Sequence, residues 1–173
     1  MDDVAKLFTR LTFGGFLAGH GAQKLLGLFG GDGVAGTSAW MESLGLRPGK
    51  IWTYLAAASE LGGGALTMLG LLSPLGPLAT IGSMSMAALT VHRGKPIWVN
   101  QGGAELPAMN IVLAGTLMLT GPGKISLDAL LGTDMPRWTA IPGLALLGGT
   151  IWYVYQLREE QLARQIGQQT SAA

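Results

Sequence analysis

The feature that most constrains this chain is a long run without charge. Residues 61–91 contain no Asp, Glu, Lys, Arg or His. The whole chain of 173 residues is 49% hydrophobic and only 12% charged, with a mean hydropathy of +0.39, whereas typical soluble domains carry about 25% charged residues. A run this apolar is more stable in hydrocarbon than in a soluble core, and about 20 helical residues cross a bilayer. The sequence therefore predicts an all-α, polytopic membrane protein.

Prolines and glycines divide the chain into apolar segments. We expect transmembrane helices at about residues 4–29, 51–72, 75–91, 105–120 and 139–157. Ser73-Pro74-Leu75-Gly76-Pro77 separates the second from the third, because proline lacks a backbone donor and clashes with the preceding turn. The predicted architecture is a four-helix transmembrane bundle over residues 1–135, followed by a fifth transmembrane helix and a polar tail over residues 136–173. The loop charges leave the orientation open, because their bias reverses if the fifth segment does not cross.

Composition excludes several functions. The chain has no cysteine, so it cannot exchange disulfides, hold an iron–sulfur cluster by thiolates, or attach haem covalently through C-x-x-C-H. A net charge of +1 and the lack of a basic run give no reason to expect nucleic acid as a partner. Residues 31–36 fit the string G-x-G-x-x-G, but a predicted membrane helix precedes them where a dinucleotide site needs a strand. We interpret them as a flexible connection.

Glu60 lies near the middle of the second predicted span. A carboxyl group at that depth costs a few kcal/mol or more unless it is paired or protonated, so it marks a functional site by default. Residues 56–65 are nearly all small, which lets another helix approach closely. The first span carries His20 and Lys24 about 40° apart on one face, and we expect one of them to meet Glu60. Gly15-x-x-x-Gly19 of that span is expected to supply the smooth contact surface.

The predicted ligand-binding set is Arg10, His20, Lys24, Glu60 and His92. A quinone head group needs donors for its carbonyls and a proton source on reduction, which His, Lys and Glu side chains can supply. The alternative is a buried ion pair that only fixes helix register. We expect no metal site, because no pair of ligand residues has helical i, i+3 or i+4 spacing. Haem would require the only two histidines to meet at one depth. No catalytic residue and no covalently bound cofactor is predicted, and quinone is the candidate ligand.

Short polar motifs follow one another along the first four predicted spans. They are Gly19-His20-Gly21-x-x-Lys24-Leu25, Ser59-Glu60-Leu61-Gly62-Gly63, Val91-His92, Gly102-Gly103-Ala104-Glu105-Leu106-Pro107, and Gly121-Pro122-Gly123 with Ser126-Leu127-Asp128. In their order and spacing the chain resembles the DoxX family of small bacterial and archaeal membrane proteins, over roughly residues 7–130. The fifth apolar segment lies beyond the family core.

The resemblance implies a multi-pass protein of the prokaryotic plasma membrane. Some family members are subunits of quinone-reducing thiosulfate oxidoreductases, and others work beside oxidative-stress enzymes in membrane complexes. We therefore expect a quinone-linked membrane subunit whose electron carriers sit on other membrane or soluble redox subunits. Two alternatives stay open: a non-catalytic anchor or scaffold that recruits soluble redox partners, and a transport module for a lipid-like molecule. Whether the chain is itself an enzyme, and whether it forms a homo-oligomer, also stays open.

Overall fold

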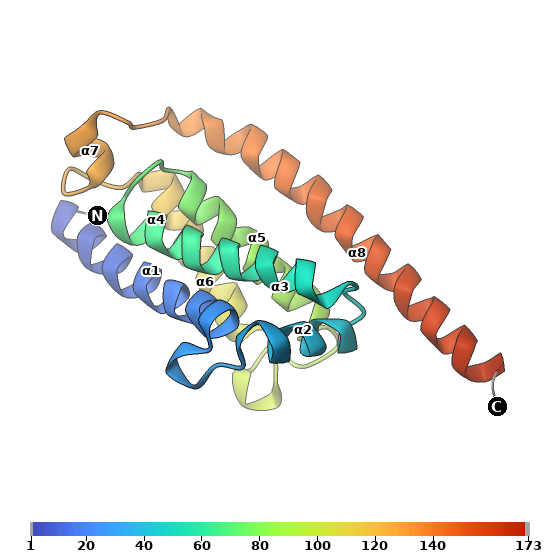
Figure 1. Ribbon diagram of the computed structural model, residues 1–173. Helices are drawn as coiled ribbons and strands as arrows, with labels where there is room; N and C mark the ends of the chain where they lie inside the picture. The colour runs from blue at the N-terminus through green and yellow to red at the C-terminus, as the bar shows by residue number, and fades with distance from the viewer. Residues whose placement is uncertain (1, 172–173) are drawn as a thin grey trace.

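The computed structural model describes residues 2–171. Its helices are α1 Asp3–Leu26, α2 Gly33–Ser43, α3 Gly49–Ala57, α4 Gly63–Leu69, α5 Leu75–Thr90, α6 Glu105–Thr120, α7 Leu127–Leu131 and α8 Ala140–Ser171 (Figure 1). A π-helical turn, Ala58–Gly62, joins α3 to α4, and short 3-10 turns lie at Leu28–Gly30, Val99–Gln101 and Arg137–Thr139. No strand occurs among the described residues, so the all-α prediction is confirmed.

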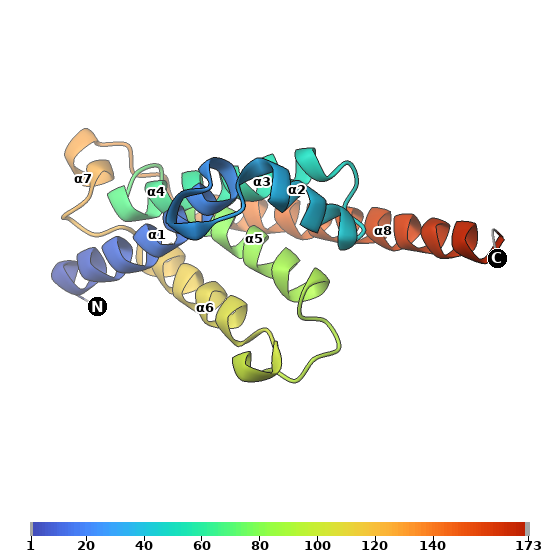
Figure 2. The same cartoon turned by 60° about the horizontal axis from the view of Figure 1, so that its bottom comes forward.

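Four long helical segments form the body of the molecule. The backbone stays helical where α3 passes into the π turn and where the π turn passes into α4, so residues 49–69 form one continuous segment, here called the rod. α1 packs along the rod, the rod packs against α5, and α5 packs against α6 (Figures 1 and 2). Within residues 2–171, no helix combines the length and the apolar character that crossing a membrane requires.

Glycines hold α1 and the rod together by letting their backbones touch. A Cβ added to Gly21 would lie 2.3 Å from the backbone nitrogen of Leu61, and one added to Gly64 would lie 2.5 Å from that of Ala18. These distances are far inside van der Waals contact, so only glycine fits at either position. The α1–rod interface therefore depends on small residues.

The prediction that Gly15 and Gly19 supply this contact is wrong. A Cβ added to Gly19 would have no neighbour within 4 Å, and one added to Gly15 would meet only the sulfur of Met68 at 3.8 Å. The buried glycines of α1 are Gly14 and Gly21. Since successive residues are rotated by about 100° around a helix, Gly15 and Gly19 lie on a different side of α1 from the side that contacts the rod.

A buried carboxylate fastens the α4–α5 connection at one end of the body. Asp128 of α7 accepts hydrogen bonds from the backbone N–H groups of Leu72 (2.8 Å) and Ser73 (2.9 Å), and from the hydroxyl of Thr133 (2.7 Å). Leu72 has φ 52°, in the left-handed region that side chains rarely adopt. The bonds to Asp128 hold the connection in this strained conformation, so α7 is part of the core of that end.

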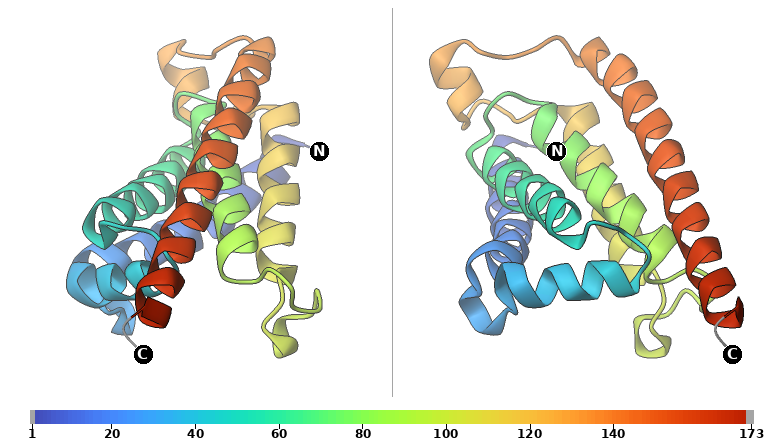
Figure 3. Two further views of the ribbon diagram at one scale, coloured as in Figure 1. Left: turned by 90° about the vertical axis from the view of Figure 1, so that its right-hand side faces the viewer. Right: turned by 45° about the vertical axis from the view of Figure 1, so that its right-hand side comes forward.

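α8 is one continuous helix of 32 residues that crosses α5 and extends past the body (Figure 3). Where it crosses, a Cβ added to Gly82 would lie 2.8 Å from the side chain of Leu147. Further along, Arg158 Nε donates to the carbonyl of Leu44 at 2.7 Å. The predicted fifth segment is thus the first part of a longer helix that also contains the polar tail and docks onto the α2–α3 corner.

Candidate functional site

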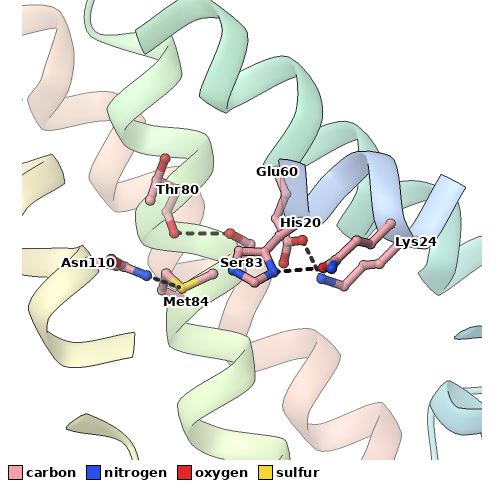
Figure 4. Close-up of polar contacts among 8 residues, drawn as sticks. His20, Lys24, Glu60, Thr80, Ser83, Met84 and Asn110 are labelled. Atoms are coloured by element: carbon pink, nitrogen blue, oxygen red, sulfur yellow. Dashed lines mark hydrogen bonds and ion pairs between the residues drawn. The ribbon is translucent and has the colours of Figure 1, made fainter. Parts of the chain in front are cut away.

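Glu60 lies in the π turn of the rod, on its buried face. The Lys24 ammonium of α1 forms a salt bridge with Glu60 Oε2 (Figure 4). The side chain of Glu60 is 7% exposed and that of Lys24 is 22% exposed. A buried carboxylate carries a large desolvation penalty that a charged partner offsets. The prediction that a base of the first helix reaches Glu60 is confirmed, and that base is Lys24.

The π turn places this acid where the rod is wider than an α-helix. Such turns interrupt α-helices as single-turn insertions and are frequent at functional sites. The residues that form it, Ala58–Gly62, are followed by two more glycines at 63 and 64. Glycine is a poor helix former, so the run 62–64 is the one sequence signal that this helix is irregular here. The sequence did not indicate a π geometry.

An apolar cavity of about 310 Å³, here called the central cavity, lies on one side of the ion pair. Its walls come from α2, the rod, α5 and α8, and besides Lys24 and Glu60 they include Trp40, Trp52, Leu55, Met86, Leu147 and Val154. Ser59 and Ser83 add two hydroxyl groups. The indole N–H of Trp52 is buried and has no hydrogen-bond partner among the described residues. An unpaired buried donor is costly, and this one is covered by neighbouring atoms of the protein while the rest of the indole lines the cavity.

A second hollow of about 560 Å³, here called the side groove, lies between α1, α5 and α6. Lys24 and Glu60 line it too, together with Phe13, Phe16, His20 and Asn110. His20 Nδ1 lies 3.0 Å from the side-chain oxygen of Gln23. The ion pair therefore stands between the central cavity and the side groove. His20 is exposed and lines the groove (Figure 4), where its bonding partner is Gln23 and not the pair.

Arg10 and His92, the other two residues of the predicted site, line neither hollow. Arg10 is buried near α7, where it donates to the carbonyl of Ile125 and interacts electrostatically with Asp128. His92 follows α5 and donates from Nδ1 to the carbonyl of Gly102 at 2.6 Å. The structure thus brings Lys24, Glu60 and His20 together and leaves Arg10 and His92 in separate contacts that tie loops to helices.

Sequence reasoning missed three parts of the site. The indole of Trp40 comes from α2, whose first turn falls within the residues 31–36 interpreted as a flexible connection; that interpretation is wrong for residues 33–36, which are helical. Leu147 and Val154 come from α8, which lies far from Glu60 in sequence. No signal in the chain pairs α8 with α2, because the contact depends on how both cross α5. Among the described residues, no group of three or more His, Cys, Asp or Glu side chains could hold a metal ion.

Fold and site together define a small all-helical protein in which a buried ion pair lines an apolar cavity between packed helices. The chain belongs to the DoxX family, whose model matches residues 5–93, the stretch from α1 to just past α5 that contains both Lys24 and Glu60. Membership makes it a small membrane-associated protein linked to oxidoreductase or stress functions. No curated protein and no solved structure gives a significant match.

Proposed function

We propose that this protein is a membrane-embedded subunit of a quinone-linked oxidoreductase or oxidative-stress complex, and that it binds a quinone or a similar apolar ligand in the central cavity. The observation that carries this proposal is the Lys24–Glu60 pair in the wall of an otherwise apolar cavity. A binding site of this kind typically has 300–1,000 Å³, mostly apolar walls and a few polar groups that orient the ligand. The central cavity has all three properties.

The polar groups of the cavity match the chemistry of a quinone. A quinone has an apolar ring and two carbonyl acceptors. The Lys24 ammonium is a donor at the cavity wall. The indole N–H of Trp52, which is buried and has no partner among the described residues, becomes a second donor when ligand binding turns the ring toward the cavity. Trp40, Trp52 and Leu55 supply flat and apolar surface for the ring. The electrons would come from a redox partner, since the chain has no cysteine ligands for an iron–sulfur cluster.

Binding of a quinone is testable with the purified protein in detergent. We expect calorimetric titration with a short-chain benzoquinone to give saturable binding. Trp52→Phe keeps the ring but removes the donor, so the dissociation constant should rise about 5- to 10-fold, as for one lost hydrogen bond. Trp138→Phe is the matched control, because Trp138 is exposed and lies outside the cavity. Absence of saturable binding to the unaltered protein would contradict the proposal.

We also propose that the body is embedded in the cell membrane as a multi-pass protein. Large apolar side chains on α1, α6 and α8 are at least 65% exposed: Phe8, Phe16, Val112, Leu119, Ile141, Leu146 and Trp152. Exposed apolar area on this scale marks a surface that contacts lipid or another protein. Expressed in a bacterium, the protein should stay with the membrane through alkaline carbonate washing and require detergent for release. Recovery in the carbonate supernatant would exclude this placement.

A scaffold that recruits soluble redox partners is the second candidate. One observation favours it: the C-terminal part of the long helix α8 (Figure 1) is polar and carries the charged residues Glu159, Glu160 and Arg164. The two candidates differ in what Glu60→Gln does inside the native complex. A quinone site predicts loss of quinone-dependent turnover in a complex that still assembles. A scaffold predicts unchanged turnover.

A further inference from the structure

A third hollow, of about 350 Å³, lies where α1 passes into α2, and is here called the vestibule. Its walls contain polar side chains and exposed loop backbone: Gln23, Gly30, Gly31, Asp32 and Thr37, with Lys24 and Trp40 at its inner side. The same two residues, Lys24 and Trp40, also line the central cavity. They therefore form the partition between a polar hollow at the loop end and an apolar cavity inside the body.

The residues at the partition differ in how far they are exposed to solvent. Trp40 is 43% exposed and the side chain of Lys24 is 22% exposed, whereas Glu60 behind them is buried. A lysine ammonium carries three donors, so Lys24 can be bonded to Glu60 and still present N–H groups to both hollows. Because Lys24 lines both hollows, it can contact water in the vestibule and a ligand in the central cavity.

Local hydrogen bonds shape the vestibule next to Lys24. The side-chain amide of Gln23 donates to the carbonyl of Phe29 at 3.2 Å, and its oxygen lies 3.0 Å from His20 Nδ1. Phe29 itself has φ 53°, a left-handed conformation that turns the chain back toward α1. This turn directs the loop alongside the C-terminal end of α1. The walls of the vestibule are therefore held by hydrogen bonds and backbone conformation.

We propose that the vestibule is the entrance through which protons reach a ligand in the central cavity, with Lys24 as the proton carrier. This inference rests on the proposed quinone site. As a two-electron donor of the redox partner reduces the quinone, each of the two carbonyl oxygens gains one proton. Lys24 gives a proton from its ammonium group and regains it from water in the vestibule, and this happens twice per quinol. No covalent bond of the chain changes.

The charged and titratable groups around the carrier fit this role. Glu60 is the ion-pair partner of Lys24 and holds its ammonium group in the wall that the hollows share, and the exposed carboxylate of Asp32 in the vestibule attracts cations. His20 stands on the groove side. The other elements that line the three hollows around the pair contribute uncharged side chains there, among them Thr37 and Trp40 of α2, Ser83, Met86 and Ala87 of α5, and Asn110 of α6.

The first test measures proton delivery separately from binding. A photoexcited ruthenium complex with ascorbate as the sacrificial donor, in a buffer free of amines, delivers two successive electrons to benzoquinone bound to the detergent-solubilised protein. Absorbance follows conversion of the semiquinone anion, which takes up the second electron and two protons, to quinol. In Lys24→Gln we expect this conversion to be roughly 10²-fold slower, the usual size of a general-acid contribution. The solvent deuterium isotope effect seen with the unaltered protein should also change. Small amines in the buffer should restore the rate, because they can enter the vestibule.

Because Lys24→Gln also removes the partner of Glu60 and can destabilise the fold, a second test leaves the pair intact. The chain has no cysteine, so Asp32→Cys can be labelled at one position with a bulky cationic thiol reagent. We expect the label to plug the vestibule and slow quinol formation several-fold, with quinone affinity unchanged. Asp134→Cys carrying the same label is the control, because Asp134 is exposed and lies near α7 and the N-terminus of α1, outside the vestibule.

The outcomes separate the two proposals. If the unaltered protein binds no benzoquinone, the quinone site fails and the proton route fails with it. If benzoquinone binds, but the label at position 32 and the label at position 134 leave the same rate of quinol formation, the vestibule is not the entrance and the quinone site stands. A slowed rate for the position 32 label alone supports the route.

Discussion

Lys24 and Glu60 belong to neighbouring segments, α1 and the rod, and each is the other's charged partner in a mostly apolar interior. Such pairs add little net stability compared with apolar packing, but removal of one partner is costly, because the remaining charge is buried without compensation. The pair therefore makes the α1–rod contact specific: any register that separates the two side chains leaves both of them destabilising.

We expect Lys24→Met to lower the free energy of unfolding by roughly 3–5 kcal/mol, because the carboxylate of Glu60 loses its partner. The double variant Lys24→Met with Glu60→Leu should recover most of this loss. Denaturant unfolding in detergent micelles, followed by circular dichroism, measures both. Lys95→Met is the control, because Lys95 is exposed. A double variant as unstable as the single one would show that the two charges are not energetically coupled.

Asp128 is the second residue on which the fold depends, through its bonds to Leu72, Ser73 and Thr133. Asp128→Ala leaves two backbone N–H groups of the strained α4–α5 connection without an acceptor, and each such loss costs about 1–3 kcal/mol. We expect a markedly lower melting temperature and early proteolysis near residue 72. Asp134→Ala is the control, because Asp134 is exposed and follows α7 in the chain. Equal melting temperatures for the two variants would contradict the role given to Asp128.

At the level of elements, backbone proximity between α1 and the rod decides where the ion pair forms. Gly21 and Gly64 remove the side chains that would separate the two segments, and the π turn then carries Glu60 at the contact. Neither feature alone brings the charges together. α1 with ordinary side chains at these positions would stand off from the rod, and Lys24 would lose its reach to Glu60.

Two glycines of α1 provide a direct comparison. In Gly21→Ala the new methyl group would meet the backbone of Leu61, so we expect strong destabilisation and loss of the closely packed bundle. In Gly19→Ala the methyl group would meet nothing within 4 Å, and alanine's better helix propensity should stabilise the protein by about 1 kcal/mol. Thermal unfolding of both variants measures the difference. The two substitutions should therefore shift the melting temperature in opposite directions.

For the whole molecule, α8 completes the central cavity although it follows the four-helix body in sequence. Leu147, Ile151 and Val154 form one of its walls. The helix is anchored at its far part by Arg158, and Gln161 exchanges hydrogen bonds with the backbone N–H and carbonyl of Arg47 (2.9 and 3.1 Å). The cavity thus depends on contacts between α8 and the connection from α2 to α3.

A protein truncated after residue 135 should keep its helical body but lose the α8 wall of the central cavity. We expect the per-residue ellipticity to stay near that of the unaltered protein, because α1, the rod, α5 and α6 pack on one another without α8. Binding of a benzoquinone should weaken at least about 10-fold, as expected when an apolar wall is removed. Calorimetric titration measures it. Undiminished affinity in the truncated protein would place the ligand outside the central cavity.

Much of the architecture could be predicted from local sequence. Apolar runs broken by glycine and proline predicted helices that correspond to α1, the rod, α5 and α6, and they placed the start of α6 at Glu105. The isolated acid among small residues at 56–65 marked the site, because an unpaired carboxylate cannot be stable there. The face of α1 that meets the rod could not be predicted, since a run of several glycines offers more than one smooth side.

The sequence by itself determined that this chain is all-helical and that Glu60 needs a base, because apolar runs and the cost of burying charge act within short stretches. Only the tertiary structure decided which base it is, and that Arg10 and His92 serve other contacts. It also decided that α2 and α8 close a cavity over the pair. Those outcomes depend on the angles at which helices far apart in the chain cross, and on the π turn that widens the rod at Glu60. No local sequence pattern encodes either of them.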